Sequence, residues 1–102
     1  MQIISNAQYD PIARRKIELS RHANKRAQQR AISQDCIPLI LAYGERSHDG
    51  KGGIRYLLTQ RAMSSLGRAV GHSQRLETLA GCYAVVDAEN ERTVITLGHR
   101  VS

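Results

Sequence analysis

The hydrophobic and polar positions of this chain change period several times, and each change predicts a new element. Between residues 20 and 32, small apolar residues recur every four positions, at Ala23, Ala27 and Ala31. That spacing is typical of one face of an α-helix. Ser20 stands just before the pattern and is a suitable N-cap, because its hydroxyl can accept a hydrogen bond from an amide of the first turn. The pattern therefore predicts a helix over 20–32.

Three later segments also have helical spacing. A second helix is predicted over 36–43, where apolar residues gather on one side and Gly44 follows the last turn. A third is predicted over 61–69 and ends at Gly71. The apolar residues of 74–80 favour one more helical turn over a strand.

Period-two alternation and β-branched residues mark the predicted strands. Residues 54–59 form one candidate, with 45–46 as its hairpin partner across a glycine-rich loop. Residues 82–87 and 92–97 carry the plainest strand pattern and predict a second hairpin. Asn90 in the intervening turn is suited to a positive φ.

The order of these elements predicts the fold class. Two helices, a strand pair, a helix and a hairpin indicate an α+β domain, with N-terminal helices packed on one face of a small antiparallel sheet. The 102-residue length suits one domain, which we place at 16–102. Residues 1–15 are predicted to be a variable N-terminal arm, in which 2–5 could form a short strand and 12–17 one or two helical turns.

Charge indicates the class of partner. Fifteen Lys and Arg residues against nine Asp and Glu give a formal net charge of +6. This excess favours a polyanion, most often nucleic acid, over a surface that is basic only for solubility or for an acidic protein partner. Cys36 and Cys82 lack a CxxC spacing, which favours free thiols in a reducing compartment. With no apolar run long enough to span a bilayer, we expect a cytoplasmic protein with no membrane partner.

The predicted first helix carries the strongest candidate chemistry. His22, Arg26 and Arg30 follow one another at i, i+4 spacing, and no acidic residue occurs between Ser20 and Ile32. Arginine binds phosphate through two parallel hydrogen bonds, and histidine exchanges a proton near neutral pH. The arrangement points to RNA binding or RNA chemistry, and its alternative is a solvated basic face.

Other candidates lie on the strands and the loop between them. Lys51 and Arg55 flank the glycine-rich loop 47–53, whose amides could approach an anion, although the loop has no Walker pattern and also suits a plain hairpin tip. Tyr56 could stack on a base or pack in the core. We expect no metal and no cofactor. Three residues with metal-binding side chains match no known zinc spacing, namely His48, Asp49 and His72.

The chain end adds His99 and Arg100 after the last predicted strand. Strict alternation puts Ile95, Leu97 and His99 on one face, and Thr96 on the other with Val94. Thr96 and His99 can then share a cleft only if a bulge forms at Gly98 or if the strand has already ended.

With these elements placed, the sequence resembles a family of small proteobacterial proteins of unknown function. The shared motifs are His-Ala-x-x-Arg, which begins at His22, and Thr-x-Gly-His-Arg, which begins at Thr96. Together with 17–21, 29–32, Gly44, 83–86 and 94–95, they cover most of 17–100. That family is itself distantly similar to RelE/ParE-like toxins and to the ribonuclease fold that barnase, colicin nucleases and RelE share.

The resemblance implies helices followed by an antiparallel sheet whose concave face holds a metal-independent RNA-cleaving site. Such a toxin-like endonuclease would act by 2′-hydroxyl attack, with RNA as substrate and a small acidic antitoxin protein as partner. His22, His99 and Thr96 are the catalytic candidates. The phosphate-binding candidates are Arg26, Arg30, Lys51, Arg55 and Arg100. The alternatives are a non-catalytic module that binds RNA or protein through the same basic helix, and a family member that has lost activity and acts as a regulator.

Overall fold

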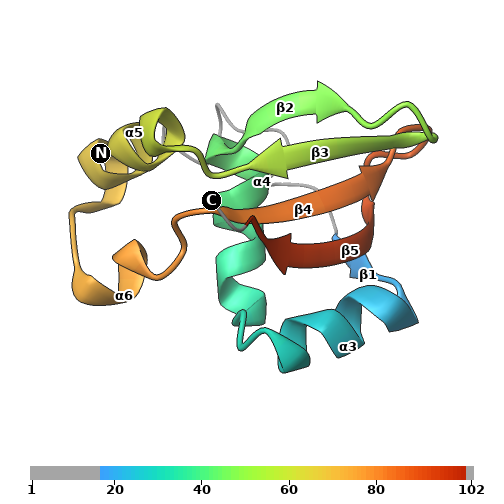
Figure 1. The fold of residues 1–102 in the computed structure, drawn as a ribbon, viewed down its shortest axis with the longest axis horizontal. Helices are drawn as coiled ribbons and strands as arrows, with labels where there is room; N and C mark the ends of the chain where they lie inside the picture. The colour runs from blue at the N-terminus through green and yellow to red at the C-terminus, as the bar shows by residue number, and fades with distance from the viewer. Residues whose placement is uncertain (1–16, 101–102) are drawn as a thin grey trace, which may run out of the picture.

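Five strands form one sheet in the order β1-β5-β4-β3-β2 (Figure 1). The computed structural model describes residues 17–100, so the arm predicted for 1–15 lies outside the described residues. The strands are β1 (Glu18–Leu19), β2 (Glu45–His48), β3 (Gly53–Leu57), β4 (Cys82–Asp87) and β5 (Thr93–His99). β1 runs parallel to β5, and the other neighbouring pairs are antiparallel. The α+β class is confirmed, but the sheet is mixed where a purely antiparallel one was predicted.

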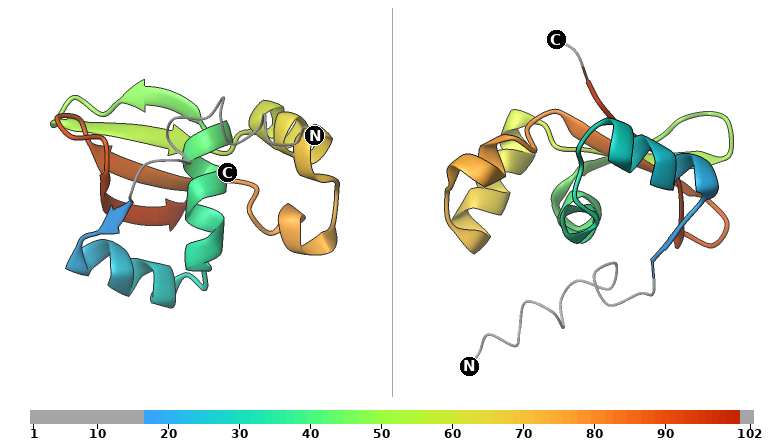
Figure 2. Two further views of the ribbon diagram at one scale, coloured as in Figure 1. Left: turned by 180° about the vertical axis from the view of Figure 1, so that it is seen from behind. Right: turned by 90° about the horizontal axis from the view of Figure 1, so that it is seen from below.

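The helices surround this sheet unevenly. They are α3 (Arg21–Gln29), α4 (Ile37–Tyr43), α5 (Gln60–Val70) and α6 (Gln74–Glu77), with a short 3₁₀ turn, η1 (Gln34–Cys36), before α4. α4 crosses one face, whereas α3 runs along the outer edge of β5, and α5 and α6 lie beyond the strand ends (Figure 2). The prediction that the N-terminal helices pack on one face therefore holds for α4 alone. Within the described part of the chain, the opposite face carries no helix, and we call it the open face.

Helix α3 is fastened to β5 by the residue that begins it. The Ser20 N–H donates to the Val94 carbonyl at 2.9 Å, and the Ser20 hydroxyl donates to the Ile95 carbonyl at 2.9 Å. The same hydroxyl accepts from the Ala23 N–H at 3.0 Å, which makes Ser20 the predicted N-cap. Ala23 and Ala27 are buried, and their small side chains let the helix lie close to the strand.

The first helix is shorter than its sequence pattern predicts. It ends at Gln29, with Arg30 as the C-cap. Ala31 takes a left-handed backbone conformation, with φ at 55°, and is exposed, so the third alanine of the predicted stripe lies outside the helix. Ile32 is buried in its place, and its N–H donates to the Ala27 carbonyl at 2.9 Å.

A single hydrophobic core lies between α4 and the covered face of the sheet. The three central strands contribute apolar side chains to it, and α3, α4 and α5 close it from the sides. Its fully buried large side chains are Ile37, Ile40, Leu41, Ile54, Leu58, Leu66, Val86, Val94 and Leu97. The predicted strands and helices therefore bury the apolar residues that defined them.

A β-bulge sets the direction of the side chains of β5. Val85 is paired with Thr96 and Val86 with Val94, which leaves Ile95 as the extra residue. Val94 and Leu97 consequently both face the core, although strict alternation would place them on opposite faces. Ile95 is 39% exposed. The strict alternation predicted along 94–99 therefore fails at Ile95, between Val94 and Thr96. The bulge is at Ile95 instead of Gly98.

The turn before β5 also differs from expectation in one residue. The positive φ belongs to Glu91, at 53°, and not to Asn90. The Asn90 side-chain oxygen instead accepts from the amides of Arg92 and Thr93, at 2.7 Å and 3.0 Å. Asn90 therefore stabilises the turn through its side chain.

Ser20→Ala should destabilise the protein by about 1–2 kcal/mol, because it removes a helix cap and a hydrogen bond to β5 together. Urea unfolding followed by circular dichroism measures the loss. Ser33→Ala is the matched control, since Ser33 caps only η1, through Asp35, and a smaller loss is expected. Equal losses in the two variants would show that the bond from Ser20 to β5 contributes nothing.

Candidate nucleic-acid interface

The open face carries cationic, polar and aromatic side chains at its centre. Arg55, Val85 and Thr96 stand side by side across β3, β4 and β5, because Val85 is paired with each of the other two. Arg55 is exposed, and Val85 and Thr96 are half-buried. On β2, Ser47 extends the row beyond Arg55. Two of the predicted site residues, Arg55 and Thr96, are thus brought to one surface.

The neighbouring row holds an aromatic ring over a glycine. Tyr83 is paired with Leu57 on one side and with Gly98 on the other. A Cβ added at Gly98 would lie 2.7 Å from the Tyr83 hydroxyl oxygen and 2.8 Å from Cζ. The ring of Tyr83 therefore extends across β5 along the surface of the open face, in space that only glycine leaves free.

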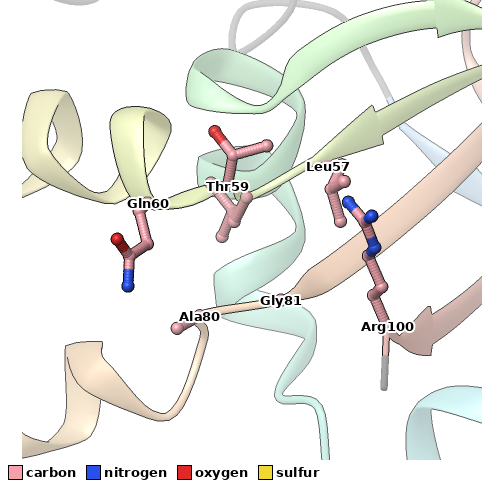
Figure 3. Close-up of a pocket in the computed structure, with 7 residues that line it drawn as sticks. Leu57, Thr59, Gln60, Ala80, Gly81 and Arg100 are labelled. Carbon is pink, nitrogen blue, oxygen red and sulfur yellow. The ribbon is translucent and has the colours of Figure 1, made fainter. Parts of the chain in front are cut away.

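A hollow of about 340 Å³ opens at the end of this row. Arg100 follows Gly98 by two residues, and its N–H donates to the Gly81 carbonyl at 2.7 Å. Its guanidinium group lies close to Leu57, and Gln60 approaches from the opposite side (Figure 3). The lining consists of Leu57, Leu58, Thr59, Gln60, Ala80, Gly81 and Arg100.

Helix α3 presents a second cationic surface beside the sheet. His22, Lys25, Arg26 and Gln29 recur with helical spacing and line a hollow of about 260 Å³. We call these four residues the basic flank of α3. Of the series His22, Arg26 and Arg30 that the sequence predicts at i, i+4 spacing, the flank includes the first two.

Helical geometry places this basic flank away from α4. Asn24 and Arg26 lie on opposite sides of the buried stripe formed by Ala23 and Ala27. The Asn24 side-chain oxygen accepts from Gln34 Nε2 at 3.2 Å, and Gln34 begins the η1 turn that leads into α4. The side of α3 that carries Asn24 therefore faces α4. The Arg26 side is turned the other way, toward the side of the open face.

The two arginines of this series differ in their surroundings. Arg26 is half-buried, and its Nε is enclosed with no hydrogen-bond partner among residues 17–100. The buried part of this side chain therefore lies against the protein. Arg30 is exposed at the C-cap of α3, and the hollow of the basic flank does not include it.

His99 lies on the other side of the sheet from Thr96. It is the last residue of β5, where sequence analysis placed it after the strand, and it is paired with Cys82 on the covered face. Its Nε2 is 3.0 Å from the Cys82 Sγ. The pairing from Thr96 to His99 is continuous, so these two residues point in opposite directions.

The two candidate histidines are not brought together. His22 is in the first turn of α3, next to Ser20, which bonds β5 at Ile95. His99 is at the far end of the same strand, against Cys82. The hollow lined by His22 does not include His99.

The glycine-rich loop bonds two of its amides to a carboxylate of its own. The Asp49 carboxylate accepts from the N–H groups of Lys51 and Gly53, at 2.6 Å and 2.9 Å. These two hydrogen bonds are the main cause that lowers the pKa of Asp49 below its ordinary value. An external anion would have to compete with this carboxylate, so the loop serves as a hairpin tip, and Lys51 offers only its exposed side chain.

Of the two alternatives predicted for Tyr56, packing in the core is confirmed. Tyr56 is 3% exposed and packs in the core. Tyr83, which was not singled out, occupies the open face. The feature that could have identified Tyr83 is its position opposite Gly98 on the neighbouring strand. A tyrosine ring lies over a neighbouring strand only where the residue opposite it is small.

In residues 17–100, no three His, Cys, Asp or Glu side chains gather as a metal ion would require. None of the helices in the same range is both long enough and apolar enough to cross a bilayer.

Comparison with known proteins adds no relative. No family model, no curated protein and no solved structure matches this chain.

The buried thiol of Cys82, beside His99, predicts that the free energy of unfolding depends on pH. Burial raises the pKa of Cys82 from 9.0 to about 11, and the nearby Cys36 acts in the same direction. The folded state then holds the thiol proton more tightly than the unfolded state does. The free energy of unfolding should therefore fall as the pH rises from about 9 to about 11. Urea titrations at the two pH values should show a smaller fall for Cys82→Ala than for the wild type.

Cys36→Ala is the control, because Cys36 is only partly buried and its replacement leaves the Cys82 thiol in place. Comparing the two pH values within each variant removes the cost of the cavity that Cys82→Ala creates. An equal fall in the wild type and in Cys82→Ala would contradict the assignment.

Proposed function

We propose that this protein binds single-stranded RNA across the open face of its sheet. The observation that carries the proposal is the row in which Arg55 and Thr96 flank Val85, beside the row that holds Tyr83 over Gly98. A flat sheet surface with an aromatic ring and flanking cations is a recurrent way to hold unpaired bases and their phosphates.

Tyr83 supplies the surface on which a base stacks. Its ring extends along the sheet over Gly98, and the side chain is only half-buried. Stacking on an aromatic ring tolerates every base, because each base has a π-face. This contact therefore favours unpaired nucleotides without reading their sequence.

Arg55 and Arg26 are the phosphate contacts of the proposal. Arg55 is exposed in the row next to Tyr83, and Arg26 belongs to the flank of α3 that faces away from α4. Lys25 and Arg30 add positive charge near the same helix. Two acidic side chains of the sheet are held in place by their own hydrogen bonds, since Glu45 accepts from the Thr59 hydroxyl at 2.6 Å and Asp87 accepts from the Glu89 amide at 2.8 Å.

Tyr83→Ala should weaken binding of an oligouridine octamer by about tenfold, whereas Tyr83→Phe should retain the wild-type affinity. Arg55→Ala should weaken binding and lower the slope of log affinity against log salt by about 0.7. Fluorescence anisotropy over a range of salt concentrations measures both quantities.

Arg68→Ala is the charge-matched control, because Arg68 lies in the last turn of α5, away from the open face. Its affinity for the octamer and its salt slope should stay close to those of the wild type. An equal loss in Arg68→Ala and Arg55→Ala would indicate attraction by net charge alone. Absence of binding by the wild type would contradict the proposal and leave an acidic protein as the partner of this surface.

Metal-independent RNA cleavage is the second candidate function. The 2′-hydroxyl would lose its proton and attack the phosphorus, which yields a 2′,3′-cyclic phosphate and a 5′-hydroxyl that gains a proton. The observation that favours this function is that His22 shares one hollow with Lys25 and Arg26. This reading assigns the acid–base role to His22 alone, since His99 is on the covered face.

His22→Ala should abolish cleavage of labelled RNA in EDTA while leaving the octamer affinity within about twofold, because Lys25 and Arg26 remain in the same hollow to hold the phosphate. His99→Gln is the control and should retain the activity. Gel electrophoresis of the products measures cleavage. Intact RNA with the wild-type protein would rule out this candidate and leave the binding function unaffected.

A further inference from the structure

We infer that the hollow beside Arg100 selects a guanine base of the bound RNA. The inference rests on the proposed function, because the RNA strand must first lie on the open face. It changes the predicted role of Arg100 from a phosphate contact to a contact with a base edge.

The lining suits a base better than a phosphate. Its walls are largely apolar, with Leu57, Leu58 and Ala80 among them, and within residues 17–100 Arg100 is the one cationic side chain of the lining. A phosphate requires several donors to replace its water, whereas a base requires apolar walls and a few polar groups at its edge. The volume of about 340 Å³ is at the small end of ligand pockets and suits one nucleotide.

The hollow adjoins the stacking surface. Leu57 lines the hollow and is also the cross-strand partner of Tyr83. Arg100 follows Gly98, over which the Tyr83 ring extends. A strand with one base stacked on Tyr83 can therefore place the adjacent base in the hollow.

Two polar side chains stand on opposite sides of the hollow, and their backbones are held on fixed elements. The Arg100 backbone is tied to Gly81 at 2.7 Å. Gln60 opens α5, whose N-cap Thr59 accepts from the Ala62 N–H at 3.1 Å and donates to Glu45 at 2.6 Å. Figure 3 shows the Arg100 guanidinium on one side of the hollow and the Gln60 amide on the other.

Guanine is the base that this pair fits best. A guanidinium group donates two parallel hydrogen bonds to the O6 and N7 acceptors of guanine. Adenine offers an acceptor and a donor at the same positions, which matches the amide of Gln60 instead. Bonds from a charged donor are stronger than those from a neutral amide, so Arg100 decides the preference.

The test compares four labelled RNA octamers by fluorescence anisotropy: oligouridine, and the same strand with one central guanosine, adenosine or cytidine. The wild type should bind the guanosine strand about tenfold more tightly than oligouridine. Arg100→Lys keeps the charge but loses the two-pronged donor, so this preference should disappear while the oligouridine affinity stays within about twofold. Arg68→Lys is the matched control and should keep the preference.

The outcomes separate this inference from the function on which it rests. Equal affinity of the wild type for all four strands, or a preference for adenosine or cytidine, would overturn guanine selection and leave RNA binding in place. A guanosine preference that survives in Arg100→Lys would overturn the role of Arg100. Failure of the wild type to bind any of the four strands would overturn both proposals.

Discussion

The pairing register between β4 and β5 is the constraint on which the rest of this structure depends. The extra residue at Ile95 lets Val94 and Leu97 point into the core together. After the bulge, Thr96, Gly98 and Arg100 fall on the open side, next to Val85, Tyr83 and the hollow. A slip by one residue would exchange these two sets of side chains. The same register therefore fixes both the core and the candidate interface.

The attachment of α3 depends on the same strand. β1 pairs with β5 for only two residues, and Ser20 then turns the chain into a helix that covers the remaining edge. This arrangement shields an edge that would otherwise be free to pair with another chain. It also keeps α3 off the open face, because the helix lies beside the sheet. The basic flank consequently stands at the border of a surface that stays accessible.

Local sequence signals predicted most elements, and long-range pairing accounts for what they missed. The Ser20 cap and the helix ends at Gly44 and Gly71 are confirmed, since each depends on a few neighbouring residues. The parallel β1–β5 pair and the bulge depend on contacts between distant segments. Alternation along the last strand placed Thr96 and His99 on opposite faces unless a bulge came between them, and the bulge at Ile95 comes before both, so this separation is confirmed. What the spacing could not give is the cross-strand pairing that puts Arg55 on the face of Thr96.

The two tyrosines of the central strands show why residue type alone could not locate the surface. Tyr56 is paired with Ala84 and Tyr83 with Gly98, so each ring lies beside a residue small enough to leave room for it. α4 covers the face of the first pair, and no described helix covers the face of the second. The same large-and-small pairing thus gives a core contact on one face and a stacking surface on the other. What distinguishes them is the placement of α4, which only the assembled fold determines.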